Sequence, residues 1–169
     1  MELFSKEQGR KIGRLLLYKN ETISVAESVS AGMLQLAFAA MENSTNFFQG
    51  GLTAYNLAQK TRQLHVEPIH AQSVNCVSTN VARQMALNVC TSFLSDWGLA
   101  LTGYATPVPE SDHKTFAFFG IAYKGKILAC GKLLPKKTET QDIQLEYTQT
   151  VLSRLQVLLA KQSSTQKKS

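Results

Sequence analysis

The chain has 169 residues, a length typical of one domain, and its 44% hydrophobic content is ordinary for a globular protein. No apolar run reaches the roughly 18 residues that cross a membrane, and the N-terminal MELFSKEQGRK has no hydrophobic signal core, so we expect a cytoplasmic protein without a membrane partner. The net charge of +6 is scattered or gathered in the C-terminal tail rather than in a basic stripe with aromatics, which argues against nucleic-acid binding.

Helix and strand patterns alternate over the first part of the chain. The order is helix 4–18, strand 22–27, helix 32–41, strand 47–55 and helix 57–64. Ser5 is well placed to cap the first helix, and Asn56 is well placed to cap the last one. Pro68 then breaks the chain.

The second part of the chain begins with a long helix and ends with another. The order is helix 79–97, strand 99–104, loop 105–114, hairpin strands 115–123 and 127–134, and helix 138–159. Residues 1–162 form a single domain in this interpretation. Residues 163–169 are polar without an apolar face, which predicts a disordered tail.

Alternation of strands and helices followed by a hairpin predicts an α/β fold. We expect a three-layer α/β/α sandwich with a mixed, mostly parallel sheet of about five strands. Ligands of such sheets bind beyond the carboxyl ends of the strands. Three loops are candidates for the site: 27–32, 43–60 and 102–114.

Lys60 is the first candidate catalytic residue. It lies at the end of the first turn of the helix that Asn56 caps, where the helix N-terminus disfavours a positive charge. Its pKa should therefore be lowered, more so if the ammonium is desolvated. A neutral lysine near Tyr55 and a hydroxyl could act as a general base. The alternative is an ordinary lysine directed into solvent.

The loop AESVSAG, residues 26–32, follows a strand and opens a helix. Its small residues let backbone N–H groups approach a ligand anion, and Ser28 and Ser30 add hydroxyl donors. The alternative is that either serine only caps the helix. The segment TGYATP, which begins with Thr102 and Gly103, could line the same cleft.

The second loop holds two adjacent hydroxyls, Ser44 and Thr45, in the segment ENSTNFF. Taken alone, this segment is also consistent with a simple turn after a helix. Three well-separated cysteines, Cys76, Cys90 and Cys130, predict reduced thiols. Neither cysteines nor histidines are spaced as metal ligands, so we expect no metal and no cofactor.

The order of these motifs resembles a known family. AES with small residues is followed by the adjacent hydroxyls, FF, GG, Tyr55-Asn56, Lys60, VEP, a Val-Ser pair before a VARQMA helix, and TG at a strand end. This order is similar to the C-terminal domain of the CinA competence/damage-inducible family, also known as nicotinamide-nucleotide amidohydrolase. The resemblance covers roughly residues 5 to 160.

The resemblance implies an activity and a set of roles. It implies a homodimer that hydrolyses the carboxamide of nicotinamide mononucleotide to nicotinate mononucleotide and ammonia, without a metal. In the family pattern Thr45 stands at the position of the nucleophile, Lys60 takes its proton, and Tyr55 relays the proton or positions the group. The residues expected to bind substrate are Glu27, Ser28, Ser30, Gly32, Ser44, Thr102 and Gly103.

The chain departs from the family pattern at four places. The family's AESCTGG loop reads AESVSAG here, which loses one glycine and puts Ser30 in place of a threonine. Asn43-Ser44-Thr45 replaces a Gly-Ser-Ser run. A glycine-rich loop is replaced by a segment with prolines and the acidic Glu110 and Asp112, which would repel a nucleotide phosphate. Two arginines before the last helix have no counterpart, although Lys136 and Lys137 could contact a phosphate. The alternative function is therefore a catalytically impaired or substrate-altered relative that binds a nucleotide or a protein partner.

Overall fold

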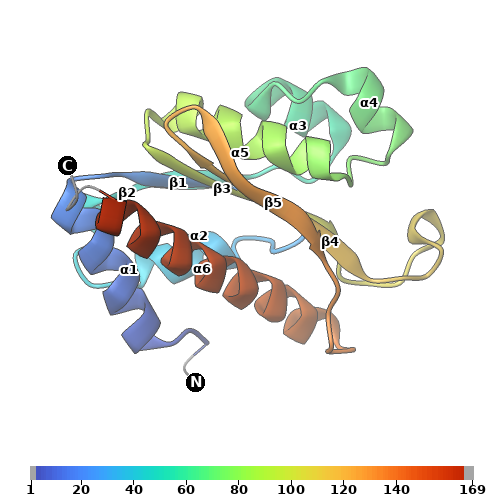
Figure 1. Cartoon of the computed structure of the whole chain (residues 1–169). Coiled ribbons are helices and arrows are strands. Elements are labelled where there is room, and N and C mark those ends of the chain that lie inside the picture. The colour runs from blue at the N-terminus through green and yellow to red at the C-terminus, as the bar shows by residue number, and fades with distance from the viewer. Residues whose placement is uncertain (1–2, 166–169) are drawn as a thin grey trace.

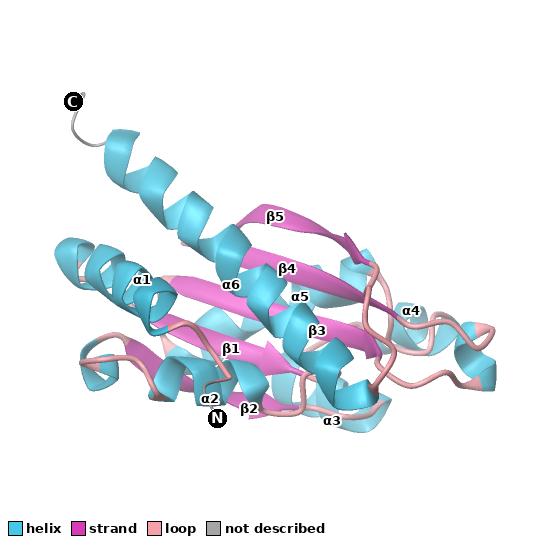
Figure 2. Ribbon diagram, turned by 90° about the horizontal axis from the view of Figure 1, so that it is seen from below, coloured by secondary structure: helices cyan, strands magenta, loops and turns pink. Residues whose placement is uncertain are grey.

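A mixed sheet of five strands forms the middle of the molecule. The computed structural model describes residues 3–165. The strands are β1 (Ile23–Glu27), β2 (Phe48–Thr53), β3 (Trp97–Tyr104), β4 (Phe116–Tyr123) and β5 (Lys126–Leu133). Their order is β2-β1-β3-β4-β5, and Figure 2 shows this order face-on. β1 pairs in parallel with β2 and β3, whereas β4 and β5 continue the sheet antiparallel.

Helices cover both faces of the sheet, which gives three layers (Figure 1). One face carries α1 (Lys6–Lys19), α2 (Met33–Ala39) and α6 (Thr140–Thr165). The other face carries α3 (Leu57–Leu64), α4 (Pro68–Ser73) and α5 (Thr79–Phe93). Two short 3-10 turns, η1 (Ser44–Asn46) and η2 (Pro109–Ser111), lie in the loops. The predicted α/β sandwich with a mixed sheet is confirmed.

Local sequence signals fix the starts of α1 and α3. The Ser5 hydroxyl accepts a hydrogen bond from the Gln8 N–H at 3.3 Å, and Asn56 Oδ1 accepts one from the Gln59 N–H at 3.0 Å. These are the N-caps expected from the sequence, and each satisfies an N–H that the helix itself leaves unpaired. The cap at Asn56 sets the position of Lys60 on α3.

Apolar side chains fill the space on each side of the sheet. Trp97 of β3, Phe38 of α2 and Tyr147 of α6 are among the largest side chains in the core on one face of the sheet, and Met85 of α5 lies in the core on the other face. Burying each aliphatic side chain of this core, such as Ile12, Leu16 or Val25, contributes about 1.5–3 kcal/mol. All five residues of β1 are buried, so the central strand is fixed from both faces.

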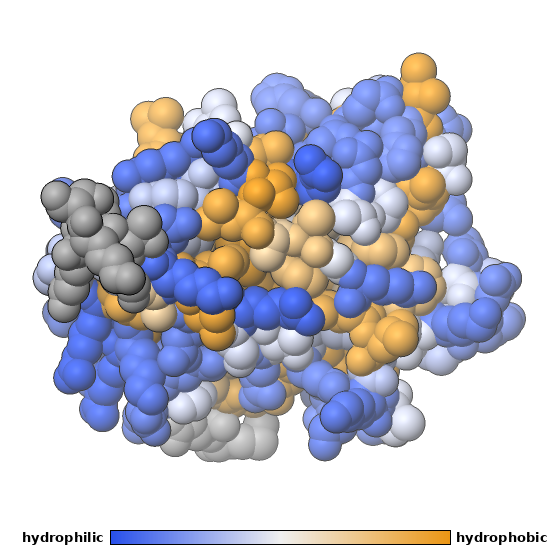
Figure 3. Space-filling model, viewed as in Figure 1, coloured by the Kyte–Doolittle hydropathy of each residue, from blue (hydrophilic) through white to orange (hydrophobic). Residues whose placement is uncertain are grey.

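Hydrophobic residues also reach the surface at one edge. Figure 3 shows a hydrophobic band across the middle of the face seen in Figure 1, where β5 lies between α5 and α6. β5 is the last strand of the sheet, and most of its residues are half-buried. Within residues 3–165 no helix is both long and apolar enough to span a membrane.

Three predicted segments differ from the structure. Pro68 does not simply break the chain: it starts α4, with the Glu67 carboxylate accepting from the Ile69 and His70 N–H groups. Helix α5 ends at Phe93 rather than at Trp97, which begins β3. Helix α6 continues to Thr165, so the first residues of the predicted tail 163–169 are helical, and 166–169 lie outside the described residues.

Candidate active site

A cavity of about 630 Å³ opens beyond the carboxyl ends of β1 and β3. It is bounded by the loop after β1, the start of α3, the turn between α4 and α5, the loop after β3, and the start of α6. Ser28, Tyr55, Lys60, Thr102 and Gly103 all line it. Five of the sequence-predicted site residues therefore come together at the sheet edge where ligands of such folds bind.

A buried lysine and a serine meet at the base of this cavity. Lys60 is 2% exposed, and its Nζ donates a hydrogen bond to Ser28 Oγ at 2.9 Å. No ion pair among residues 3–165 involves Lys60. An amine held against a hydroxyl without a neighbouring carboxylate is the arrangement in which a lysine can deprotonate a serine.

Burial also adjusts the proton affinity of this pair. Desolvation lowers the pKa of Lys60 below its ordinary value, and the nearby Cys76 thiol opposes this only in part. The pKa of Cys76 is raised by burial, with Lys60 as the opposing influence. The lysine is thus shifted toward its neutral, basic form, as expected from the sequence, and burial is the leading cause.

The loop after β1 is built around the carboxylate of Glu27, which is fully buried. Glu27 Oε2 accepts hydrogen bonds from Ser30 Oγ at 2.7 Å and from the N–H groups of Gly32 and Leu34 at 3.1 and 3.0 Å. Glu27 Oε1 accepts one from the Gln35 N–H at 2.9 Å. The start of α2 is therefore already occupied by an anion from the chain itself.

This arrangement corrects one prediction. Ser30 and Gly32 were expected to hold a ligand anion at the start of α2, and Glu27 was expected to contact substrate. Instead, Ser30 and Gly32 bind the Glu27 carboxylate, and none of the three residues lines the cavity. A carboxylate at a helix N-terminus is favoured by the helix dipole, so the chain stabilises its own loop there.

Ser28 is held rigidly because it extends the sheet. Its N–H donates to the Leu101 carbonyl at 2.9 Å, and the adjacent Glu27 carbonyl accepts from the Ala54 N–H at 2.8 Å. The chain then turns sharply, with Ala31 at φ 51° and Gly32 at φ 101°. The turn directs the carboxylate of Glu27 toward α2 and the hydroxyl of Ser28 toward the cavity.

Thr102 and Gly103 line the cavity but have structural reasons for their identity. The buried Thr102 hydroxyl donates to the Cys76 carbonyl at 2.8 Å and so fixes the turn between α4 and α5. A Cβ on Gly103 would lie 2.5 Å from the Ala117 Cα, because β3 and β4 pair closely there. Their predicted substrate contact is thus limited to forming the wall of the cavity.

Tyr55 stands at the mouth of the cavity. Its side chain is 70% exposed and lines the cavity together with Asn56. Among the described residues its hydroxyl has no hydrogen-bond partner, so it is available to a bound molecule. The order Tyr55-Asn56-Lys60 around the start of α3 therefore places one residue at the base of the cavity and another at its entrance.

The predicted pairing of Thr45 with Lys60 is wrong. Thr45 lies in η1, before β2, whereas Lys60 follows β2. β2 is six residues long, so its two ends, one on the side of Thr45 and the other on the side of Lys60, are roughly 20 Å apart at about 3.3 Å per residue. Thr45 is exposed, and the Ser44 hydroxyl donates to the Ala39 carbonyl at 3.2 Å, so this pair of hydroxyls forms a turn at the opposite edge of the sheet.

Several residues of the cavity were not singled out as site residues from the sequence. These are chiefly Asn75, Cys76, Tyr104, Glu110 and Gln144. The pKa of Tyr104 is raised, mainly by burial and next by Glu110, while the Asn75 side chain hydrogen-bonds it and opposes the rise. Tyr104 and Glu110 lie in the expected loop 102–114, where the acidic charge of Glu110 was the sequence signal, whereas Asn75, Cys76 and Gln144 lie outside the three expected loops.

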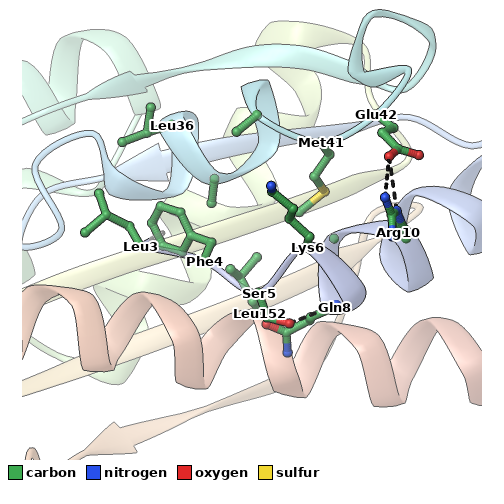
Figure 4. A pocket seen from close by; sticks show the side chains of 13 residues that line it. Leu3, Phe4, Ser5, Lys6, Gln8, Arg10, Leu36, Met41, Glu42 and Leu152 are labelled. Carbon is green, nitrogen blue, oxygen red and sulfur yellow. Dashed lines mark hydrogen bonds and ion pairs between the residues drawn. The ribbon is translucent and has the colours of Figure 1, made fainter. Parts of the chain in front are cut away.

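A second cavity, of about 370 Å³, lies between the start of α1, α2 and α6. Figure 4 shows Phe4, Met41 and Leu152 around it, with the ion pair between Arg10 and Glu42 at one side. Its lining is mainly apolar and brings together no hydroxyl with a desolvated base. Among residues 3–165, no group of three or more His, Cys, Asp or Glu side chains is arranged to hold a metal ion.

Comparison with known proteins identifies the family. The family model of the CinA C-terminal domain matches residues 6–159. The chain belongs to this family. A CinA-like protein of Rippkaea orientalis is 37% identical over 122 residues, which are 72% of this chain and 29% of that protein. A CinA-like protein of Thermosynechococcus vestitus is 35% identical over 126 residues, which are 75% of this chain and 30% of that protein.

This member of the CinA family spans under a third of the length of the curated relatives it matches. Solved structures of similar length share its fold. The competence or damage-inducible protein from Enterobacter asburiae superposes with a TM-score of 0.85 at 25% identity, covering 91% of this chain and 97% of that one. A CinA superfamily protein from Klebsiella pneumoniae has a TM-score of 0.86 at 20% identity, covering 95% and 99%.

Proposed function

We propose that this CinA-family chain is an amidohydrolase in which Ser28 is the nucleophile and Lys60 the general base. The hydrogen bond of 2.9 Å between Lys60 Nζ and Ser28 Oγ, inside a cavity at the carboxyl edge of the sheet, is the observation that carries the proposal. The family resemblance implies nicotinamide mononucleotide as the substrate, with nicotinate mononucleotide and ammonia as products. Ser28 takes the role that the sequence had assigned to Thr45.

The first half of the reaction forms an acyl-enzyme. Neutral Lys60 accepts the proton of Ser28 as Oγ attacks the carboxamide carbon, which becomes tetrahedral. Lys60 then returns the proton to the amide nitrogen, the C–N bond breaks, and ammonia leaves. Water hydrolyses the resulting ester with the same lysine as base, which frees the carboxylic acid and restores Ser28.

The oxygen that becomes negative in this step needs hydrogen-bond donors. Within residues 3–165 the N–H group of Val29 has no intramolecular acceptor, and Val29 follows Ser28 directly and lines the cavity. We assign this N–H to the developing oxyanion, a role that backbone N–H groups beside a nucleophile often take. Tyr55, at the mouth, would orient the substrate or exchange the leaving proton.

The proposal is tested by ammonia release from nicotinamide mononucleotide and from its unphosphorylated counterpart, with three purified proteins: unaltered, Ser28→Ala and Thr45→Ala. We expect the Ser28→Ala protein to lose at least about 10³-fold in rate and the Thr45→Ala protein to keep its rate within about twofold. Release that survives in Ser28→Ala but vanishes in Thr45→Ala would contradict the assignment. No release of ammonia from either compound by folded protein would contradict the activity on this substrate class.

Bulky aromatic side chains do not fill the cavity. The nearby Phe116 and Phe118 do not line it but pack edge to face with each other, and Lys132 lies over both rings. In the loop after β3, the apolar side chains that line the cavity are those of Ala105 and Val108. The homodimer and the cytoplasmic location implied earlier stay predictions.

A further inference from the structure

The charges around the cavity are unusual for a site that would bind a phosphate ester. Of the described side chains that line it, only Lys60 and Glu110 belong to the charged types Asp, Glu, Lys and Arg. Lys60 is buried, hydrogen-bonded to Ser28 and shifted toward its neutral form. Glu110 therefore supplies the only formal charge on the wall when Lys60 is neutral, and that charge is negative.

Helix N-termini could bind an anion in place of cationic side chains, but those near the cavity are capped by side chains or flanked by acidic residues. The start of α2 holds the Glu27 carboxylate. The start of α6 reaches the cavity through Thr140, but Glu139 precedes it and Asp142 lies in its first turn. The side chain of Asn56 caps α3. Among residues 3–165, side chains of the chain itself therefore engage the starts of α2 and α3, and acidic residues flank the start of α6.

The remaining polar groups suit an uncharged or cationic molecule. The amide side chains of Gln72 and Asn75 and the hydroxyl of Thr106 line the cavity as neutral hydrogen-bonding groups. Tyr55 and Tyr104 contribute two aromatic side chains to the lining. Aromatic faces attract cations and stack on planar rings, which favours a flat nitrogen heterocycle with a positive charge.

We infer that this cavity selects carboxamides whose remaining part is uncharged or cationic, and disfavours phosphorylated ones, with Glu110 as the residue that sets the preference. This inference rests on the proposed amidohydrolase function. Glu110 lies on η2 at the rim, close enough to Tyr104 to raise the pKa of its phenol. A carboxylate there repels a phosphate group and attracts a cationic ring.

The test compares two carboxamides that differ only in the phosphate. Nicotinamide riboside has a cationic pyridinium ring and no phosphate, and nicotinamide mononucleotide adds the phosphate. We expect kcat/KM for ammonia release to be at least about tenfold higher for the riboside, the order of effect of one poorly screened charge. Equal values, or a preference for the mononucleotide, would overturn the inference and leave the amidohydrolase proposal in place.

Glu110→Gln tests the residue, and Asp112→Asn is the matched control. Asp112 lies two residues further along the same exposed segment but does not line the cavity. We expect Glu110→Gln to narrow the preference by about threefold to tenfold, mainly through a higher kcat/KM for the mononucleotide. Asp112→Asn should leave the preference unchanged. Equal effects of the two substitutions would show a general charge effect and overturn the role of Glu110.

A binding measurement tests the ligand preference independently of the hydrolysis reaction. If neither compound releases ammonia, titration calorimetry with the folded protein carrying Ser28→Ala still decides between the two ligands. Tighter binding of the riboside supports the inference even though the hydrolysis proposal has failed. Equal or tighter binding of the mononucleotide, or binding of neither, overturns it.

Discussion

Glu27 and Lys60 both lie next to Ser28, Glu27 in the chain and Lys60 in space. Both side chains are almost completely buried, at 0% and 2% exposure. Four hydrogen-bond donors surround the carboxylate of Glu27, whereas the described contacts of the Lys60 amine consist of one hydrogen bond to a serine hydroxyl. Burying an ionisable group is costly unless its partners replace water. The comparison teaches that Glu27, whose hydrogen bonds replace water, stabilises the fold, whereas Lys60, whose burial is poorly compensated, is available for chemistry.

The same contrast recurs away from the site. Glu21 is 4% exposed and accepts hydrogen bonds from Trp97 Nε1 at 2.8 Å and the Tyr123 hydroxyl at 2.6 Å. Lys124 Nζ approaches it at 3.4 Å. This carboxylate is fully partnered and lies far from the cavity lining, so it fixes the ends of β3 and β4.

The largest effect should come from Lys60→Met, which removes the base but keeps a side chain of similar length. Ammonia release should fall by about 10³-fold, within the usual range for loss of a general base. The free energy of unfolding should not fall, because the substitution removes an amine whose burial is poorly compensated. Urea unfolding and the ammonia assay, run on the same preparation, check both halves.

Arg62→Met is the matched control, since Arg62 lies on the same helix and is exposed. It should leave ammonia release and the urea midpoint nearly unchanged. A Lys60→Met protein that is clearly less stable than the Arg62→Met protein would show that Lys60 holds the fold, and the comparison with Glu27 would break.

Glu27→Gln should have the opposite outcome and lower the free energy of unfolding by about 3 kcal/mol. The amide loses the charge and turns an NH₂ group toward donors that need an acceptor, the usual cost of leaving buried groups unmatched. Urea denaturation measures it. The exposed Glu139→Gln should shift stability by no more than about 0.5 kcal/mol. If both variants unfold at the same urea concentration, the loop is not built on the carboxylate.

A smaller effect should appear in the pH dependence of stability. The pKa of Lys60 is lowered in the folded protein from 10.5, so between the lowered pKa and 10.5 the unfolded chain binds more protons than the folded one. Stability then rises with pH across that window, by up to about 1.4 kcal/mol per pH unit for this group. Below the lowered pKa the full free-energy cost of burying the charged Lys60 ammonium is present, and above 10.5 this cost disappears.

The measurement is the urea midpoint across the alkaline range for the unaltered protein and for Lys60→Met. The difference between the two proteins should narrow as pH rises, and the ammonia-release rate should rise over the same range as Lys60 loses its proton. A constant difference in stability at all pH values would mean that the Lys60 pKa is not lowered.

Much of the fold could be predicted because hydrophobic periodicity and caps are local. The helix that contains Lys60 was placed correctly by Asn56, and the hairpin by its two apolar runs around Lys124 and Gly125. Helix α4 is absent from the sequence prediction because a proline often breaks the chain, yet Pro68 occupies the first position of the helix, where proline also fits.

The site was harder to predict because its key contact joins different loops. The sequence singled out Ser28, Lys60 and Thr45, but which hydroxyl meets the lysine depends on strand direction and order. β2 runs parallel to β1, with Ile23 opposite Phe48, and this carries the residues before β2 away from the carboxyl edge. No local pattern records that register, and the family motif order alone led to the wrong hydroxyl.

The mixed sheet also has a consequence for the order in which the molecule assembles. β4 and β5 are joined by a tight turn at Lys124 and Gly125, so they can pair after closing a very short loop. The strand that carries Ser28 must instead find β3, with Ile23 opposite Trp97 across the intervening helices. Long-range parallel pairing is slow because the chain loses the entropy of closing a long loop before the contacts between the strands can stabilise it. The chain should therefore form its hairpin early and the strand before Ser28 late, so the amide of Ile121 should become protected from hydrogen exchange before Ser28 reaches Lys60.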